Sequence, residues 1–244
     1  MNFLFPARIP DRCALVLDGR RVEVMVKVSA RARSYRLSVP HHGDPVLTLP
    51  SHGRWKEAEA FLHRHEGWLA ARMRRSAPRT PFADGELVPL RGAVHRIHAT
   101  GRLRGRVDVA EIDGEPSLLV PGEAAHLARR LTEWLKAEAL VDLSARSAIH
   151  AERLDVTVRS VAMRSQTTRW GSCSSTGRLN YNWRLVLAPP FVLDYVAAHE
   201  VAHLVHMNHS PSFWKTVERT LPDMSQGRSW LKANGKLLMG YGQD

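Results

Sequence analysis

Cysteine is scarce in this chain of 244 residues, in which only Cys13 and Cys173 occur. Two thiols so far apart are too few for a disulfide framework, which excludes the small disulfide-rich secreted class. No run of 18 apolar residues is present, which excludes a transmembrane helix of the usual kind. Residues 1–6 are apolar, but no basic segment precedes them and charged residues soon follow, so they make a poor signal peptide. We therefore expect a cytoplasmic protein that does not bind membranes.

Acidic residues are fewer than basic ones, with 24 Asp and Glu against 35 Lys and Arg, which gives a net charge of +11. Arginine makes up most of the excess, and its guanidinium suits bidentate contact with phosphate or carboxylate. This charge permits a nucleic acid or a nucleotide as a partner, but solvated surfaces and a general preference for arginine account for it as well. The sequence contains no recognised nucleic-acid-binding motif and does not indicate an oligomeric state.

The most informative segment that is present is His-Glu-Val-Ala-His at residues 199–203. On a helix, His199 and His203 project from one face about 40° apart, so both imidazoles can reach one Zn²⁺. Glu200 can then face the open coordination position, take a proton from a bound water and deliver it to the leaving group. The pattern predicts a hydrolase with one Zn²⁺ per chain, although another divalent metal would also fit. The absence of glycine and proline from Phe191 to Ser210 predicts the helix that this geometry needs.

Two histidines are candidates for the third metal ligand. His206 shares the face of the first two if the helix continues, but three histidines on one straight helix cannot readily surround a tetrahedral ion. His209 lies ten residues after His199, which is the first-to-third ligand spacing of the metzincin pattern, where the chain turns before the last histidine. We therefore favour His209, with a turn at Met207-Asn208. Ser210-Pro211 would then cap and begin a new helix that ends near Leu221.

A developing oxyanion needs a positive or hydrogen-bond-donating group beside the metal. The candidates are Arg169, Tyr195 and His206. Arg169 opens the segment Arg-Trp-Gly-Ser-Cys-Ser at residues 169–174, whose small residues allow a backbone to approach a ligand closely. The same segment is also compatible with an ordinary Gly/Ser turn. No base is evident for the Cys173 thiol, so we expect it to be a packed residue and not a nucleophile.

The chain is expected to contain three regions: strands and a helix packed on the core (1–80), a linker with a short β-rich stretch (81–120), and a catalytic domain (121–244). The first contains strands Arg21–Val28, Tyr35–Val39 and Val46–Leu49 and helix Trp55–Arg74. The second contains strands Leu87–Leu90, Val94–Ala99, Arg106–Ile112 and Ser117–Val120. The third contains helix Glu123–Ile149, strands Val156–Arg164 and Leu179–Leu187 joined by a hairpin, the motif helix and a closing helix Ser225–Leu238. The expected fold class is α+β, with a zincin-like core of a long helix, antiparallel strands and a ligand helix.

Several of these motifs resemble the bacterial YgjP-like metallopeptidase-domain proteins, relatives of the SprT-like and other zincin domains. The matching residues are Arg169–Ser174, Asn180–Leu185, Pro189-Pro190, Asp194–Val196, His199-Glu200, Asn208–Ser210 and Phe213-Trp214. The resemblance is specific from about Met163 to Pro222. It implies a zinc site of His199, His203 and His209 with Glu200 catalytic. It also implies peptidase activity by kinship of fold, with nucleotide phosphohydrolysis as a second activity suggested for the family.

Three functions remain open at this point, of which we favour a zinc metallopeptidase acting on peptides or proteins. A metal-dependent nucleoside triphosphate pyrophosphohydrolase would need arginines that converge on the metal, and four arginines flank the motif in sequence: Arg164, Arg169, Arg178 and Arg184. A peptidase would need a cleft with a free strand edge. A purely structural zinc site is disfavoured because a closed site leaves Glu200 no water to activate, and a fourth protein ligand would revive it.

Overall fold

The computed structural model describes residues 9–40, 44–74, 80–166 and 168–242. The chain divides into two compact units, Met1–Ala77 and Pro78–Asp244, each with its own buried apolar cluster. The β-rich residues 81–120 belong to the second unit together with the predicted catalytic region. Among the described residues, no helix is both long and apolar enough to span a membrane.

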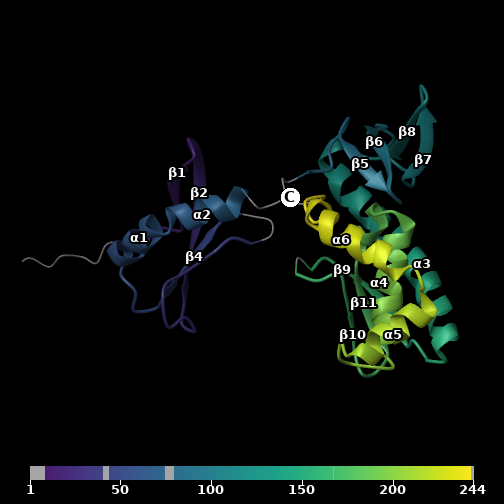
Figure 1. Ribbon diagram of the computed structural model, residues 1–244. Coiled ribbons are helices and arrows are strands. Elements are labelled where there is room, and N and C mark those ends of the chain that lie inside the picture. The colour runs from purple at the N-terminus through teal and green to yellow at the C-terminus, as the bar shows by residue number, and fades with distance from the viewer. Residues whose placement is uncertain (1–8, 41–43, 75–79, 167, 243–244) are drawn as a thin grey trace, which may run out of the picture. The chain divides into compact units, whose positions relative to one another are not determined.

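The first unit is a four-stranded sheet with two helices (Figure 1). Its strands lie in the order β1 (Arg12–Leu17), β2 (Arg20–Ser29), β4 (Val46–Pro50), β3 (Arg36–Ser38), and only the β2–β4 pair is parallel. The predicted strand Arg21–Val28 is confirmed within β2, in which Val24 and Val26 are buried and Val28 is exposed. The predicted helix Trp55–Arg74 is instead two helices, α1 (Trp55–Arg64) and α2 (Glu66–Arg74). They separate at His65, whose ring Nδ1 hydrogen-bonds the carbonyl oxygen of Phe61 at 2.8 Å, an oxygen that a continuous helix would use itself.

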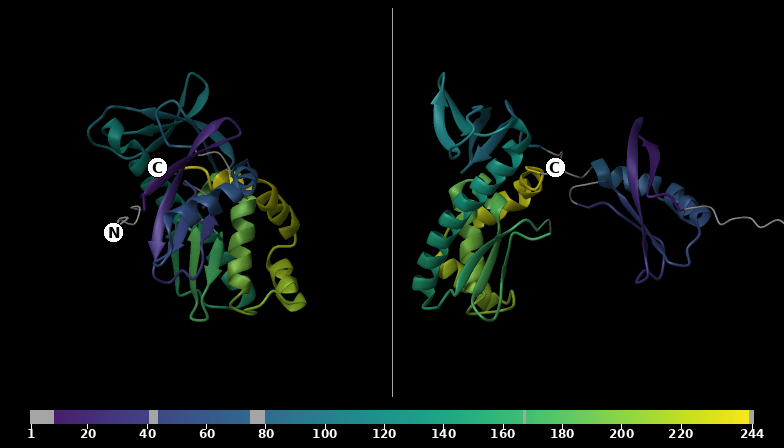
Figure 2. Two further views of the ribbon diagram at one scale, coloured as in Figure 1. Left: turned by 90° about the vertical axis from the view of Figure 1, so that its left-hand side faces the viewer. Right: turned by 180° about the vertical axis from the view of Figure 1, so that it is seen from behind.

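The second unit begins with a sheet of four short strands. Their order is β5 (Leu87–Leu90), β6 (Ala93–Ala99), β8 (Glu115–Val120), β7 (Asp108–Ile112). These strands confirm the predicted β-rich stretch to within two residues at each end. The sheet contacts the long helix α3 (Leu127–Leu154) through β8, and Figure 2 shows it beyond one end of that helix.

Helix α3 is the central support of the second unit. A short 3₁₀ turn, η1 (Ala124–His126), precedes it, and Asp155 ends it in the left-handed conformation with φ of 53°. It therefore starts and ends later than the predicted Glu123–Ile149. Its buried residues recur every four positions over most of its length, which is the pattern of one helical face against a core. They include Leu127, Leu131, Leu135, Ala139 and Leu143.

A three-stranded sheet covers the other part of α3, in the order β10 (Gly171–Cys173), β11 (Arg178–Asn182), β9 (Ser160–Arg164). The predicted antiparallel hairpin is wrong, because β11 pairs with β9 in parallel and only β10 and β11 are antiparallel. The predicted strand Leu179–Leu187 is also too long. It gives way to the 3₁₀ helix η2 (Trp183–Leu187), where the Asn182 side chain accepts a hydrogen bond from the Arg184 amide and turns the backbone. All five η2 residues are buried, so alternation of large apolar residues here reflects burial on all sides and not a strand.

Three further helices complete the unit: α4 (Pro190–Ala202), α5 (Pro211–Thr220) and α6 (Met224–Leu238). Helix α4 packs against α3, α5, α6 and β10, so nearly every residue in its second half is buried. It ends at Ala202, before the turn expected at Met207-Asn208. The predicted Ser210 cap is confirmed, since its hydroxyl accepts a hydrogen bond from the Phe213 amide. The chain is thus a mixed α/β protein with three sheets and six α-helices among the described residues.

Candidate metal centre

The end of α4 and the turn after it bring three imidazoles together. His199 lies in the last turn of α4, His203 directly follows the helix, and His209 precedes the Ser210 cap of α5. One ring nitrogen from each lies within 4.8 Å of the other two, and the Nε2 atoms of His199 and His209 are 3.1 Å apart. A tetrahedral ion with Zn–N bonds of about 2.0–2.1 Å needs nitrogens roughly 3.4 Å apart. The cluster is therefore close to the dimensions of a zinc site.

The turn between the second and third histidines is fixed by local hydrogen bonds. His203 Nδ1–H donates to the carbonyl oxygen of His206 at 3.1 Å, which leaves Nε2 of His203 directed to the cluster. The His206 amide in turn donates to the carbonyl of Ala202 at 3.0 Å. Asn208 Oδ1 accepts from the Ser210 amide at 3.3 Å, and this bond holds the corner at which His209 lies. His206 is thus placed by its backbone, and its imidazole is not part of the cluster.

The donor set fits a divalent metal chemically as well as geometrically. Burial, with smaller contributions from His203, His209 and Arg228, lowers the pKa of His199 to about 3. Burial also lowers the pKa of His203. Both rings are therefore neutral near pH 7, which is the form that binds metal ions. His199 Nδ1 is buried without a hydrogen-bond partner among the described residues, and Nε2 is the ring nitrogen that faces His209, so Nε2 is the atom available to a metal ion.

Two aromatic side chains from α5 hold the imidazoles in place. The Phe213 ring lies 4.9, 4.5 and 4.8 Å from the rings of His199, His203 and His209. Trp214 stacks on His209 with ring centroids 5.7 Å apart and an angle of 24° between the planes. Helix α5 therefore restricts the rotamers of all three histidines.

Glu200 lies on the side of α4 that faces β10. Its side chain is buried, and this burial raises its pKa to about 8, although the charge of Arg169 acts in the opposite direction. A Cβ atom on Gly171 would lie 2.4 Å from Glu200 Oε1 and 2.6 Å from its Cγ and Cδ. The β10 backbone thus runs directly against the carboxylate, with no room for a side chain between them. Strand β10 is an edge strand, since it pairs only with β11.

The structure places the other predicted site residues at different distances from this centre. Arg169 is exposed and near enough to Glu200 for its charge to affect the carboxyl. Tyr195 is buried, with its ring 6.0 Å from that of His199, and burial raises the pKa of its hydroxyl. Arg164 donates to Asn180 at 3.0 Å, and buried Arg184 donates to the carbonyls of residues 241 and 242, so both guanidiniums have hydrogen-bond partners outside the cluster.

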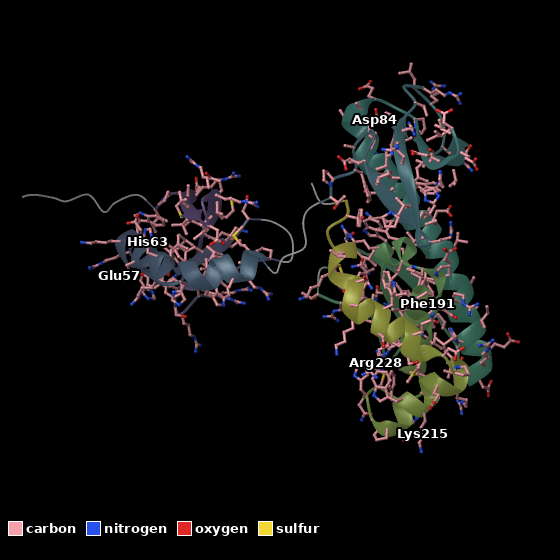
Figure 3. All side chains as sticks on the ribbon, turned by 45° about the horizontal axis from the view of Figure 1, so that its top comes forward. Glu57, His63, Asp84, Phe191, Lys215 and Arg228 are labelled. Carbon is pink, nitrogen blue, oxygen red and sulfur yellow. The ribbon has the colours of Figure 1, made fainter. Side chains whose placement is uncertain are left out.

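One residue near the cluster has no distinguishing sequence pattern. Arg228, labelled in Figure 3, lies on α6 with its Cζ 4.2 Å from the centre of the Trp214 ring. Its charge adds a small contribution to the lowered pKa of His199 and opposes the rise in the pKa of Tyr195 that burial causes. It lies in a predicted helix, 19 residues after His209 in sequence, and only the packing of α6 against α4 brings it here. Cys173 on β10 has its pKa raised to about 11 by burial and by Glu200, so its thiol is protonated near pH 7.

Comparison with known families agrees with this geometry. The family model described as "YgjP-like, metallopeptidase domain" matches residues 33–234. The chain belongs to this family. No curated protein matches the chain. Among solved structures, the metallopeptidase zymogen abylysin of Pyrococcus abyssi is similar, with 21% identity over 37% of this chain and 93% of that chain and a TM-score of 0.33.

Proposed function

We propose that this protein is a zinc metallopeptidase in which His199, His203 and His209 hold the metal and Glu200 is the catalytic acid–base group. The observation that carries the proposal is the convergence of three imidazoles beside a buried carboxyl group that faces an edge strand. Membership of a metallopeptidase-domain family supports the reaction class. Three histidines form the ligand set of an open catalytic zinc site, and no fourth His, Cys, Asp or Glu joins them among the described residues.

Different groups around the cluster would have different roles in hydrolysis. A divalent ion held there supplies Lewis acidity, which polarises a carbonyl group and makes water a stronger nucleophile at neutral pH. Burial raises the pKa of Glu200, and a cation bound at the imidazoles would lower it again, so that the carboxylate can accept a proton from the attacking water and pass it to the leaving nitrogen. The β10 backbone packs against this carboxylate. Tyr195 and Arg169 are the neighbours that can donate to a developing oxyanion.

The edge strand β10 supports a peptide as the substrate. Residues Gly171–Cys173 pair with β11 on one side only, so their other side can hydrogen-bond an extended chain. A peptide paired in this way would run past Glu200, because Gly171 contacts that side chain. This position suits cleavage of a backbone amide.

Nucleoside triphosphate pyrophosphohydrolysis is the second candidate. It is favoured by Arg169 and Arg228, which both act electrostatically on residues of the centre. It is weakened by Arg164 and Arg184, whose guanidiniums hydrogen-bond the protein itself. We therefore place it after peptide hydrolysis.

The test is hydrolysis by the purified protein loaded with Zn²⁺, Mn²⁺, Co²⁺ or Mg²⁺, with a fluorogenic peptide library and nucleoside triphosphates as substrates. We expect metal-dependent peptide cleavage that Glu200→Gln abolishes while metal content by mass spectrometry stays at the wild-type value. Glu218→Gln, at an exposed carboxylate on α5, is the matched control and should retain activity. Release of phosphate or pyrophosphate that only Glu200→Gln abolishes, without any peptide cleavage, would overturn the proposal.

A further inference from the structure

Most of the positive charge of the chain belongs to the first compact unit. Residues 1–77 contain 14 Lys and Arg against 7 Asp and Glu, so less than a third of the chain carries +7 of the net charge of +11. A general preference for arginine would add charge to both units in proportion to their lengths. The three-histidine cluster belongs to the second unit, so the proposed hydrolase does not account for this charge.

The sheet of the first unit is covered by helices on one face only. Side chains alternate between the two faces of a strand, and one set of alternate residues from β1, β2 and β4 packs with α1 and α2 in a single apolar cluster. Both described helices of the unit contribute to that cluster, so neither of them covers the opposite face. We call this opposite face the open face.

Basic side chains lie across the open face. Arg12 on β1, Lys27 on β2 and Arg36 on β3 are all exposed. Thr48 of β4 is paired with both Lys27 and Arg36, so the Cα atoms of these two residues are roughly 10 Å apart at about 4.8 Å per strand. Among the described residues of this face, the acidic one is Glu23, which is already paired with an arginine of its own strand at 3.2 Å. The open face therefore carries a band of cations without compensating acidic groups.

A groove with an exposed indole adjoins this band. Strand β3 is an edge strand, and a groove of about 440 Å³ lies between it and α2. Arg36 and Leu37 of β3 line the groove on one side, and Trp68 and Arg72 of α2 line it on the other. Trp68 is 47% exposed, although the next two residues of α2 are buried. A planar ligand that covers this indole would gain the free energy of burying it.

The chemistry of the groove and the band fits a single-stranded nucleic acid. An indole stacks on bases of any sequence, and lysine and arginine side chains along a sheet bind the phosphates of the same strand. A base can enter a groove only when it is unpaired, which favours a single strand over a duplex. A lipid bilayer also presents anionic groups, but it offers no planar group that could enter the groove.

We propose that the open face and the groove at its β3 edge bind single-stranded nucleic acid. Trp68 stacks on one base, and Arg36, Lys27 and Arg12 bind phosphates of the same strand. The site belongs to the first unit and is independent of the proposed peptidase function. Neutralising three phosphates predicts that log affinity falls with log salt concentration with a slope of about −2, since each phosphate of a single strand contributes roughly −0.7.

The experiment measures binding of the full-length protein to fluorescein-labelled oligonucleotides of about 15 nucleotides by fluorescence anisotropy at several salt concentrations. Oligodeoxythymidylate and oligouridylate distinguish DNA from RNA, and binding of either supports the proposal. We expect Trp68→Ala to weaken binding about tenfold through lost stacking and Trp68→Phe to retain most of the affinity. Lys27→Gln and Arg36→Gln should each weaken binding and reduce the salt slope by about 0.7.

Arg64→Gln is the matched control, because Arg64 is an exposed arginine of α1 in the same unit but lies outside the open face and the groove. It should bind as the wild type does, and circular dichroism should show every variant folded. A blunt duplex bound as tightly as the single strand, wild-type affinity in Trp68→Ala and Arg36→Gln, or binding to vesicles of anionic phospholipid with none to oligonucleotides would each overturn the proposal. Each of these results would leave the peptidase proposal in place.

Discussion

Gly171→Ala is a direct test of how the β10 backbone orients the Glu200 carboxylate, for which we propose the catalytic role. The added Cβ would lie 2.4 Å from Glu200 Oε1 and 2.6 Å from Cδ, whereas ordinary contacts begin near 3.4 Å. Either the carboxylate or the strand must therefore move by about 1 Å. A shift of that size costs on the order of 100-fold in rate when it affects a catalytic group, equivalent to about 2.7 kcal/mol of transition-state stabilisation.

The assay compares kcat/KM on a cleavable peptide with the zinc content of the same protein. We expect the rate to fall about 100-fold while one zinc per chain is retained, because the three imidazoles do not touch Gly171. Gly67→Ala is the matched control, since an added Cβ at that helical position would meet nothing within 4 Å. Wild-type kcat/KM in a folded, zinc-loaded Gly171→Ala protein would refute the reasoning.

Three further predictions concern the metal centre and its supports. His209→Ala should weaken zinc binding at least 100-fold in a chelator competition and His206→Ala should not, because only the backbone carbonyl of His206 contacts the cluster; equal loss in both would contradict the ligand assignment. Asp194→Asn should lower the free energy of unfolding in urea by about 2 kcal/mol at pH 7, after allowance for the partial exposure of Arg146. Burial alone would raise the pKa of Asp194, but hydrogen bonds from His150 and Arg146 lower it below 3.8. This stabilisation is therefore present above pH 4 and disappears as the pH falls further. A difference in unfolding free energy between wild type and Asp194→Asn that stays constant down to pH 2 would contradict this dependence on the ionised carboxylate. Cys173, with its pKa near 11, should resist iodoacetamide at pH 8 in the folded protein and react in urea, as followed by mass spectrometry; rapid labelling of the folded protein would show that the thiol is not buried as described.

Several elements could be predicted because their signals are local. The strand at β2, the Ser210 cap and the long helix at α3 were each predicted from residues that are close neighbours in the sequence. The errors occur where a local pattern had two structural solutions. Alternating large apolar residues at 179–187 fit a strand, and the strand does form up to Asn182. From Trp183 to Leu187 the backbone is a 3₁₀ helix, because these residues are buried on every side and the Asn182 side chain caps the turn.

The sequence by itself determined the chemistry of the candidate site, because the spacing of His199, Glu200 and His203 on a helix follows from 3.6 residues per turn. It also pointed to His209, since a proline-started, serine-capped helix requires the chain to turn just before it. Only the tertiary structure decided what surrounds these residues. The approach of Gly171 to Glu200 and the position of Arg228 over Trp214 join segments from different parts of the chain, and such contacts depend on how helices and sheets pack. Packing of this kind leaves no periodic pattern in one sequence, so it could be seen only in the folded protein.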